Sequence, residues 1–166
     1  MRPCLLALLM LSAAAPLAAA PPPNPQIDYP GFAALTSEVV PYRASRLLDW
    51  RQFAAMAKKK DVLLLDARSA EAFRAGHIAG AVNLPLPDFN ADSLAAAIGQ
   101  TDRPILIYCN NNFRNNVSPV PLKRVALALN IQTFINLVGY GYRNVHELGE
   151  VIDFTSADVS WVKGEG

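Results

Sequence analysis

The sequence has few of the residues that build metal sites. Its 166 residues include two cysteines, Cys4 and Cys109, and two histidines, His77 and His146. A zinc site takes three or four ligands of these kinds, so no metal site is expected. We therefore expect a protein that works with side chains alone and needs no cofactor.

An excess of charge of one sign is also missing. The chain has 15 lysines and arginines against 14 acidic residues, which gives a net charge of +1. Such a balance creates no overall field that would attract a polyanion. No nucleic-acid partner is expected, and the sequence gives no indication of the oligomeric state.

Long hydrophobic runs are missing after the first twenty residues. Residues 1–20 combine Arg2, an apolar run from Leu5 to Leu11 and a stretch of small residues, which is the pattern of a secretory signal peptide. No later stretch approaches the ~20 apolar residues of a membrane-spanning helix. We expect an exported protein, in the bacterial periplasm, with no stable membrane association once the signal is cleaved. An uncleaved anchor is the alternative.

Removal of the signal peptide would leave Cys109 as the one cysteine. Exported proteins usually pair their cysteines, so a solitary thiol is either a small buried hydrophobe or is kept for its reactivity. Cys109 follows the apolar stretch Ile105–Tyr108, and Arg114 stands five positions later. At the carboxyl end of a buried parallel strand, backbone N–H groups favour a thiolate. The arginine is suited to holding an oxyanion. The sequence thus predicts a nucleophilic cysteine, with a structural cysteine as the alternative.

Strands and helices are expected to alternate along the chain. Residues 21–41 are predicted to be a proline-rich linker and irregular lead-in, 42–153 the folded domain, and 154–166 a tail of unknown role. Continuous apolar strands between helices indicate a parallel sheet covered on both faces. The expected strands are Val62–Leu65, Ala81–Leu84, Ile105–Tyr108 and Thr133–Leu137. Five helices are expected. The first starts at Asp49, the second runs from its cap Ser69 through Ala75, and the third spans Leu94–Ile98 and is ended by Gly99. The fourth runs from Ser118 to Leu129, and the fifth runs from Tyr140 to about Ile152.

Three motifs carry a resemblance to a known family. They are Leu-Leu-Asp-Ala-Arg at 64–68, Glu-Ala-Phe at 71–73 and Gly-His-Ile-Ala-Gly-Ala-Val-Asn-Leu-Pro at 76–85. Together they resemble the signature of the rhodanese homology domain, and the resemblance continues through Cys109 and the turn at 136–141, over about residues 42–153. It implies an α/β, rhodanese-like fold with a central parallel five-stranded sheet and helices on both faces.

The resemblance also implies an activity. A single-domain exported sulfurtransferase would carry sulfane sulfur as a persulfide on Cys109, taking it from thiosulfate or a similar small anionic donor and passing it to a thiol or cyanide. The six-residue loop from Cys109 to Arg114 is the rhodanese form, whereas the related phosphatases and arsenate reductases use seven residues. The resemblance assigns substrate binding to this loop, that is, to Asn110, Asn111, Asn112, Phe113 and Arg114.

Two other functions stay open. One is a non-enzymatic persulfide carrier or binding module, and the other is a cysteine-dependent phosphatase or arsenate reductase, which the short loop disfavours. The three consecutive asparagines depart from the family pattern and leave the choice of substrate open. The other signature residues are expected to support the structure: Asp66, Arg68 and Glu71 by ion pairing and capping, and His77 as a hydrogen-bonded histidine in a turn.

Overall fold

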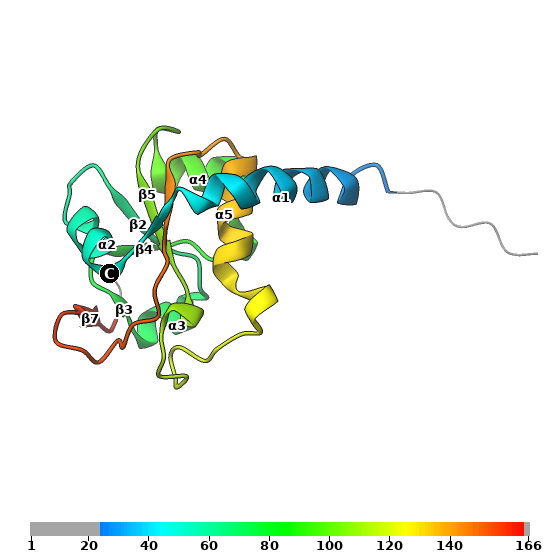
Figure 1. Ribbon diagram of the computed structural model, residues 1–166. Coiled ribbons are helices and arrows are strands. Elements are labelled where there is room, and N and C mark those ends of the chain that lie inside the picture. Colours follow the sequence, from blue (N-terminus) through cyan, green and yellow to red (C-terminus); the bar gives the residue numbers. More distant parts are fainter. Residues whose placement is uncertain (1–23, 165–166) are drawn as a thin grey trace, which may run out of the picture.

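A five-stranded parallel sheet lies at the centre of the molecule (Figure 1). The computed structural model describes residues 24–164. The strand order is β1-β6-β5-β2-β4, and every pairing is parallel. The bounds of these strands are β1 Leu47–Leu48, β2 Leu63–Asp66, β4 Ala81–Asn83, β5 Ile105–Tyr108 and β6 Val145–Leu148. The predicted fold class is therefore confirmed.

Helices cover both faces of this sheet (Figure 1). One apolar core lies between the sheet and α1, α4 and α5, and a second core lies between the sheet and α2 and α3. The bounds of the helices are α1 Tyr29–Ala44, α2 Trp50–Ala57, α3 Ala70–Ala75, α4 Ala91–Ile98 and α5 Leu129–Gly139.

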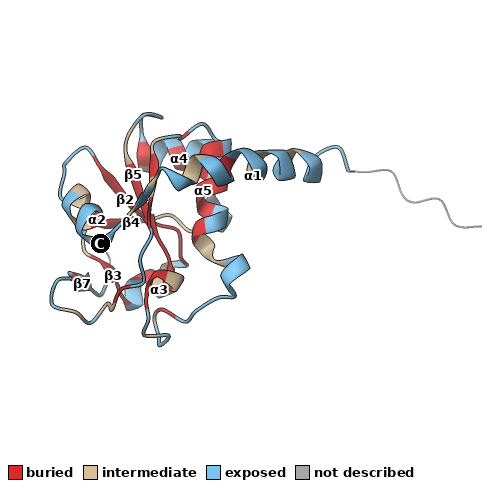
Figure 2. Ribbon diagram, viewed as in Figure 1, coloured by how far each residue is buried: buried red, intermediate tan, exposed pale blue. Residues whose placement is uncertain are grey.

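The central strand β5 is buried on both sides, as Figure 2 shows for the middle of the sheet. Successive side chains of a strand point to opposite faces. Ile105 and Ile107 accordingly pack in the core under α1 and α5, and Leu106 and Tyr108 pack in the other core. The alternation directs Cys109, the next residue, toward the side of α1 and α5.

Several predicted element ends are confirmed. The α2 helix begins with a capping box in which the Asp49 side chain accepts from the Gln52 N–H and the Gln52 side chain accepts from the Asp49 N–H. Ser69 caps α3, and Gly99 follows the last residue of α4 with a φ of 83°. Such a positive φ is strained for residues with a Cβ, which explains why a glycine ends this helix.

The irregular lead-in expected for residues 21–41 is wrong from residue 29 onward, because residues 29–44 form α1. Asp28 caps this helix by accepting from the Gly31 N–H, and Pro30 lies in its first turn. Pro41 lies inside the helix near its end. Much of α1 extends beyond the sheet (Figure 1), and Val39 is its buried residue.

Three expectations for the second half of the chain are also wrong. The helix expected from Ser118 is absent, because residues 118–128 are irregular apart from the short 3-10 helix η3, Val125–Leu127. The strand expected at residues 133–137 belongs to α5, and the helix expected at residues 140–152 contains the strand β6. The tail also takes part in the fold, since β7 (Trp161–Val162) pairs antiparallel with β3 (His77–Ile78).

The predicted signal peptide lies outside the described residues. Within residues 24–164, no helix has both the length and the apolar character needed to cross a membrane.

Candidate functional site

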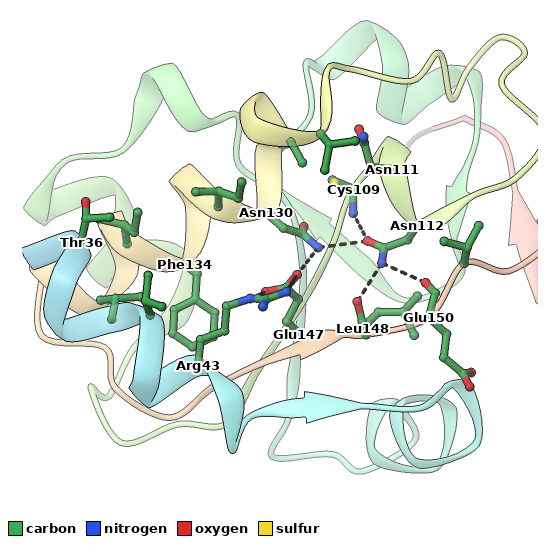
Figure 3. A pocket seen from close by; sticks show the side chains of 18 residues that line it. Thr36, Arg43, Cys109, Asn111, Asn112, Asn130, Phe134, Glu147, Leu148 and Glu150 are labelled. Carbon is green, nitrogen blue, oxygen red and sulfur yellow. Dashed lines mark hydrogen bonds and ion pairs between the residues drawn. The ribbon is translucent and has the colours of Figure 1, made fainter. Parts of the chain in front are cut away.

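Cys109 lies at the carboxyl end of β5 and lines a cavity of about 430 Å³ (Figure 3). The side chain is 1% exposed, and Cys109 is the one free cysteine among the described residues. The cavity lies between α1, the start of α5 and the end of β6. The other residues that line it are Thr36, Val39, Val40, Arg43, Asn111, Asn112, Val125, Ala128, Asn130, Ile131, Phe134, Ile135, Glu147, Leu148, Gly149, Glu150 and Val151.

Backbone amides surround the Cys109 sulfur. The backbone N–H groups of Asn111, Leu129 and Asn130 act to lower the pKa of the thiol. The Asn112 N–H donates to the Cys109 backbone oxygen at 3.0 Å. Leu129 and Asn130 form the first turn of α5, whose N-terminus favours negative charge.

The pKa of Cys109 is nevertheless raised above its ordinary value. Burial disfavours the charged thiolate and is the largest cause, and the negative charge of Glu147 adds to it. The amides reduce this rise without reversing it. The expectation that the surroundings favour a thiolate is therefore corrected: the resting group is a buried thiol with amide donors in place for a negative charge.

The Asn112 side chain fixes the loop that follows Cys109 (Figure 3). Its Oδ1 accepts from the Cys109 N–H at 2.9 Å and from Asn130 Nδ2 at 3.0 Å. Its Nδ2 donates to the backbone oxygens of Leu148 at 2.7 Å and Glu150 at 3.1 Å. An amide side chain offers two acceptor sites and two donors, so the Asn112 side chain has no capacity left for a substrate.

The other two asparagines hold the long segment between β5 and α5. Asn110 Nδ2 donates to the Pro121 oxygen at 2.9 Å, and Asn110 Oδ1 accepts from Arg68 at 3.4 Å. Asn111 binds both backbone groups of Lys123, its Nδ2 donating at 2.9 Å and its Oδ1 accepting at 3.1 Å. The three asparagines, predicted to bind substrate, thus use their side chains to bind the protein itself.

Phe113 and Arg114 turn away from Cys109. Phe113 is fully buried in the core on the opposite face of the sheet and forms a bridge with Ile152. Arg114 is exposed and lines a separate depression with Trp50 and Asp153. The structure therefore does not bring Arg114 into the cavity that Cys109 lines.

A charged pair that the sequence did not predict lies in the cavity. Arg43 donates to both carboxylate oxygens of Glu147, at 2.5 and 2.7 Å, and Glu147 also accepts from Asn130 at 3.2 Å. The hydrogen bond to Glu147 raises the pKa of Arg43. Glu147 is 5% exposed on a central strand. The sequence around Glu147, Val-His-Glu-Leu at residues 145–148, gives no local sign that this acid is buried, and the helix expected over residues 140–152 conceals the strand.

The remaining signature residues lie away from the cavity. Asp66 and Arg68 form a buried ion pair at 2.6 Å, and the Tyr108 hydroxyl donates to Asp66 at 2.7 Å. His77 is fully buried, with Nδ1 against a backbone oxygen, and Glu71 is exposed in the first turn of α3. Between residues 24 and 164 there is no cluster of three or more possible metal ligands.

The signature motifs, the parallel sheet and the placement of Cys109 agree with one family. The family model of the rhodanese-like domain matches residues 49–148. The chain belongs to the rhodanese-like domain family. The match begins after the end of α1, so the part of the cavity wall formed by Thr36, Val39, Val40 and Arg43 comes from outside the matched segment.

Several relatives share part of this rhodanese-like domain. The chain is 39% identical over 64 residues to thiosulfate sulfurtransferase GlpE of Shewanella oneidensis, covering 37% of this chain and 58% of that protein. It is 30% identical over 90 residues to the uncharacterized protein YqhL of Bacillus subtilis, covering 54% of this chain and 68% of that protein. It is 43% identical over 53 residues to the HTH-type transcriptional regulator Rv0324 of Mycobacterium tuberculosis, covering 32% and 22%.

Two solved structures resemble the fold alone. A rhodanese with anions from E. coli is 22% identical with a TM-score of 0.43, over 62% of this chain and 99% of that one. The Alr3790 protein from Anabaena is 18% identical with a TM-score of 0.48, over 70% of this chain and 92% of that one.

Proposed function

We propose that the protein is a sulfurtransferase that accepts sulfane sulfur on Cys109 as a persulfide and passes it to a second molecule. The observation that carries this proposal is the position of Cys109. It is a free thiol at the end of a central strand, in a cavity and among inward-facing backbone amides. Membership of the rhodanese-like family and the similarity to a protein named thiosulfate sulfurtransferase support the same chemistry.

The reaction would be a double displacement. The Cys109 thiol first loses its proton to water, and the thiolate attacks the sulfane sulfur of the donor. The sulfur–sulfur bond of the donor breaks, and the leaving group departs with the electron pair. The backbone amides of Asn111, Leu129 and Asn130 would stabilise the thiolate and then the persulfide, as donors aimed at a developing negative charge do.

A phosphatase or arsenate reductase fits this site less well. Both act on multiply charged oxyanions, which are usually held by a free arginine. Of the lysines and arginines in the described part of the chain, Arg43 alone lines the cavity, and Glu147 already neutralises it. Arg114, the cation expected for this role, lines another depression.

Mass spectrometry of the purified protein tests the proposal. After incubation with thiosulfate or cysteine persulfide and removal of the donor, we expect one added sulfur atom, located on the peptide that contains Cys109. The Cys109→Ser variant should gain none, and its unchanged far-ultraviolet circular dichroism would show that the fold is intact. Failure of both donors to add sulfur to Cys109 would contradict the proposal.

We also propose that the protein acts after export, on the strength of the leader-like residues 1–20. Fractionation of cells that express the full chain should find the protein outside the cytoplasm. Cytoplasmic recovery at full length would contradict this part of the proposal.

A further inference from the structure

We infer that the molecule receiving sulfur from Cys109 is an uncharged organic thiol whose apolar body occupies the cavity between α1 and α5. This inference rests on the proposed persulfide chemistry and names its acceptor. Three observations carry it: the apolar wall of the cavity, the absence of a free positive charge there, and a buried carbonyl oxygen without a partner.

The wall and mouth of the cavity are apolar. Four of its lining side chains are apolar yet exposed: Val40 of α1, Val125 of η3, Ile131 of α5 and Val151 after β6. Side chains from four separate segments thus converge on one opening. Buried apolar residues such as Phe134 continue the wall inward. A cavity of about 430 Å³ has the size of small-molecule sites, and its lining suits an organic body better than a small inorganic anion.

The charges around the cavity favour an uncharged ligand. Arg43 is the one lysine or arginine that lines it within residues 24–164, and both of its hydrogen bonds to Glu147 hold it in an ion pair. Glu150 also lines the cavity, but its carboxylate is directed toward α2, where it accepts from the Trp50 N–H at 2.7 Å (Figure 3). A free anion would therefore find no unpaired positive charge among the described residues that line the cavity. An uncharged ligand needs none.

Asn130 supplies a polar group for that ligand (Figure 3). Its Nδ2 donates to Asn112 and Glu147, and these two acceptors fix which end of the amide is the oxygen. The residue is 4% exposed and lines the same cavity as Cys109, yet its Oδ1 has no hydrogen-bond partner among the described residues. Buried carbonyl oxygens are normally satisfied, so a donor from a ligand is expected here. The S–H of an acceptor thiol is such a donor, in the cavity that Cys109 also lines.

The transfer step balances without another reactant. The acceptor thiol gives up its proton, and its sulfur attacks the outer sulfur of the Cys109 persulfide. A new sulfur–sulfur bond forms on the acceptor as the bond between the outer sulfur and the cysteine sulfur breaks. The cysteine sulfur keeps the electron pair of that bond and takes up the proton. One thiol and one persulfide are consumed, and one of each is produced.

A chain-length series tests the inference. The full chain is loaded from cysteine persulfide, freed of donor and mixed with straight-chain thiols from ethanethiol to pentanethiol, with cyanide as a small reference acceptor. The second-order rate constant for loss of the persulfide should rise by up to about fourfold for each added methylene, the value for full burial of that group.

Substitutions at the mouth locate the effect. Val40→Gln and Val125→Gln alter exposed side chains, so both variants should fold, and each should slow pentanethiol at least threefold more than it slows cyanide. Val82→Gln is the matched control, since Val82 is an exposed valine of β4 that does not line the cavity. It should change neither rate.

The outcomes separate the two proposals. Rates that are independent of chain length, or equal effects of Val40→Gln on cyanide and pentanethiol, would overturn the inferred acceptor and leave the persulfide chemistry standing. Absence of any sulfur on Cys109 after loading would overturn both.

Discussion

Replacement of Asn112 by alanine should lower the free energy of unfolding more than the same replacement of its neighbours Asn110 and Asn111. The Asn112 side chain makes four hydrogen bonds, all to groups around the Cys109 loop and the end of β6. The side chain is 7% exposed, so water cannot easily replace the lost partners. Asn112 therefore connects the nucleophile to the neighbouring strand.

The magnitude follows from these four bonds. A hydrogen bond contributes about 1 kcal/mol net, and a buried group left without its partner costs about 1–3 kcal/mol. Because some of the freed groups can find other partners in the alanine variant, we expect a loss of about 3–4 kcal/mol. A domain of this size loses about 2–4 °C of melting temperature per kcal/mol, so the melting temperature should fall by about 6–16 °C.

Urea unfolding followed by circular dichroism measures this loss, with Asn111→Ala as the matched control. Asn111 makes two hydrogen bonds, both to the exposed backbone of Lys123, and its loss should cost about 1 kcal/mol or less. Equal unfolding midpoints for the two variants would refute the assignment of Asn112 as the residue that fixes the loop.

Four further predictions concern ionisation and packing. Burial raises the pKa of Cys109, so the rate of its alkylation by iodoacetamide should increase with pH. The rate should reach half its maximum at a higher pH than for a free cysteine in an unfolded peptide. A lower midpoint would contradict the burial argument. For the same reason the folded state holds this proton more tightly than the unfolded state, so stability should fall as pH rises above the unfolded pKa; a stability that rises there would oppose this sign. Glu147→Gln removes a negative charge that raises the pKa of Cys109, so the alkylation midpoint should move to lower pH, and an unmoved midpoint would show that this charge does not act on the thiol. Gly76→Ala would place a Cβ against the Trp161 indole, which must then shift. We expect the free energy of unfolding in urea to fall by about 1–3 kcal/mol and the tryptophan fluorescence spectrum to change. Unchanged stability and fluorescence would argue against the contact of β7 with this turn.

The first half of the domain was predictable because its signals are local. Asp49 and Ser69 cap helices through their own side chains, and Gly99 ends a helix by its backbone conformation. The strand Ile105–Tyr108 was predicted with its true bounds, since it is a short apolar run between polar segments. Such features depend on neighbouring residues alone.

The second half depends on contacts between distant residues. Ser118 and Pro119 have the composition of a helix start, but the side chains of Asn110 and Asn111 bind backbone groups further along this segment. The run from Thr133 to Leu137 contains residues common in strands, yet its buried side chains pack as one face of α5. Strand β6 forms because it pairs with both β5 and β1. Local propensity did not contain this information.

The candidate site divides in the same way. The position of Cys109 at a strand end followed from the apolar run before it, and the strand alternation now explains which face of the sheet it meets. The cavity could not be predicted, because its wall is formed by α1 and by the Arg43–Glu147 pair, which joins residues 104 positions apart.

A single-turnover experiment tests whether Cys109 carries the transferred sulfur. The protein is loaded with sulfur, freed of donor and mixed with excess thiol, and the sulfur that appears on the thiol is counted against the protein. One sulfur atom should be transferred for each chain that carried it, and none from the Cys109→Ser variant treated in the same way. Undiminished transfer by that variant would show that Cys109 does not carry the sulfur.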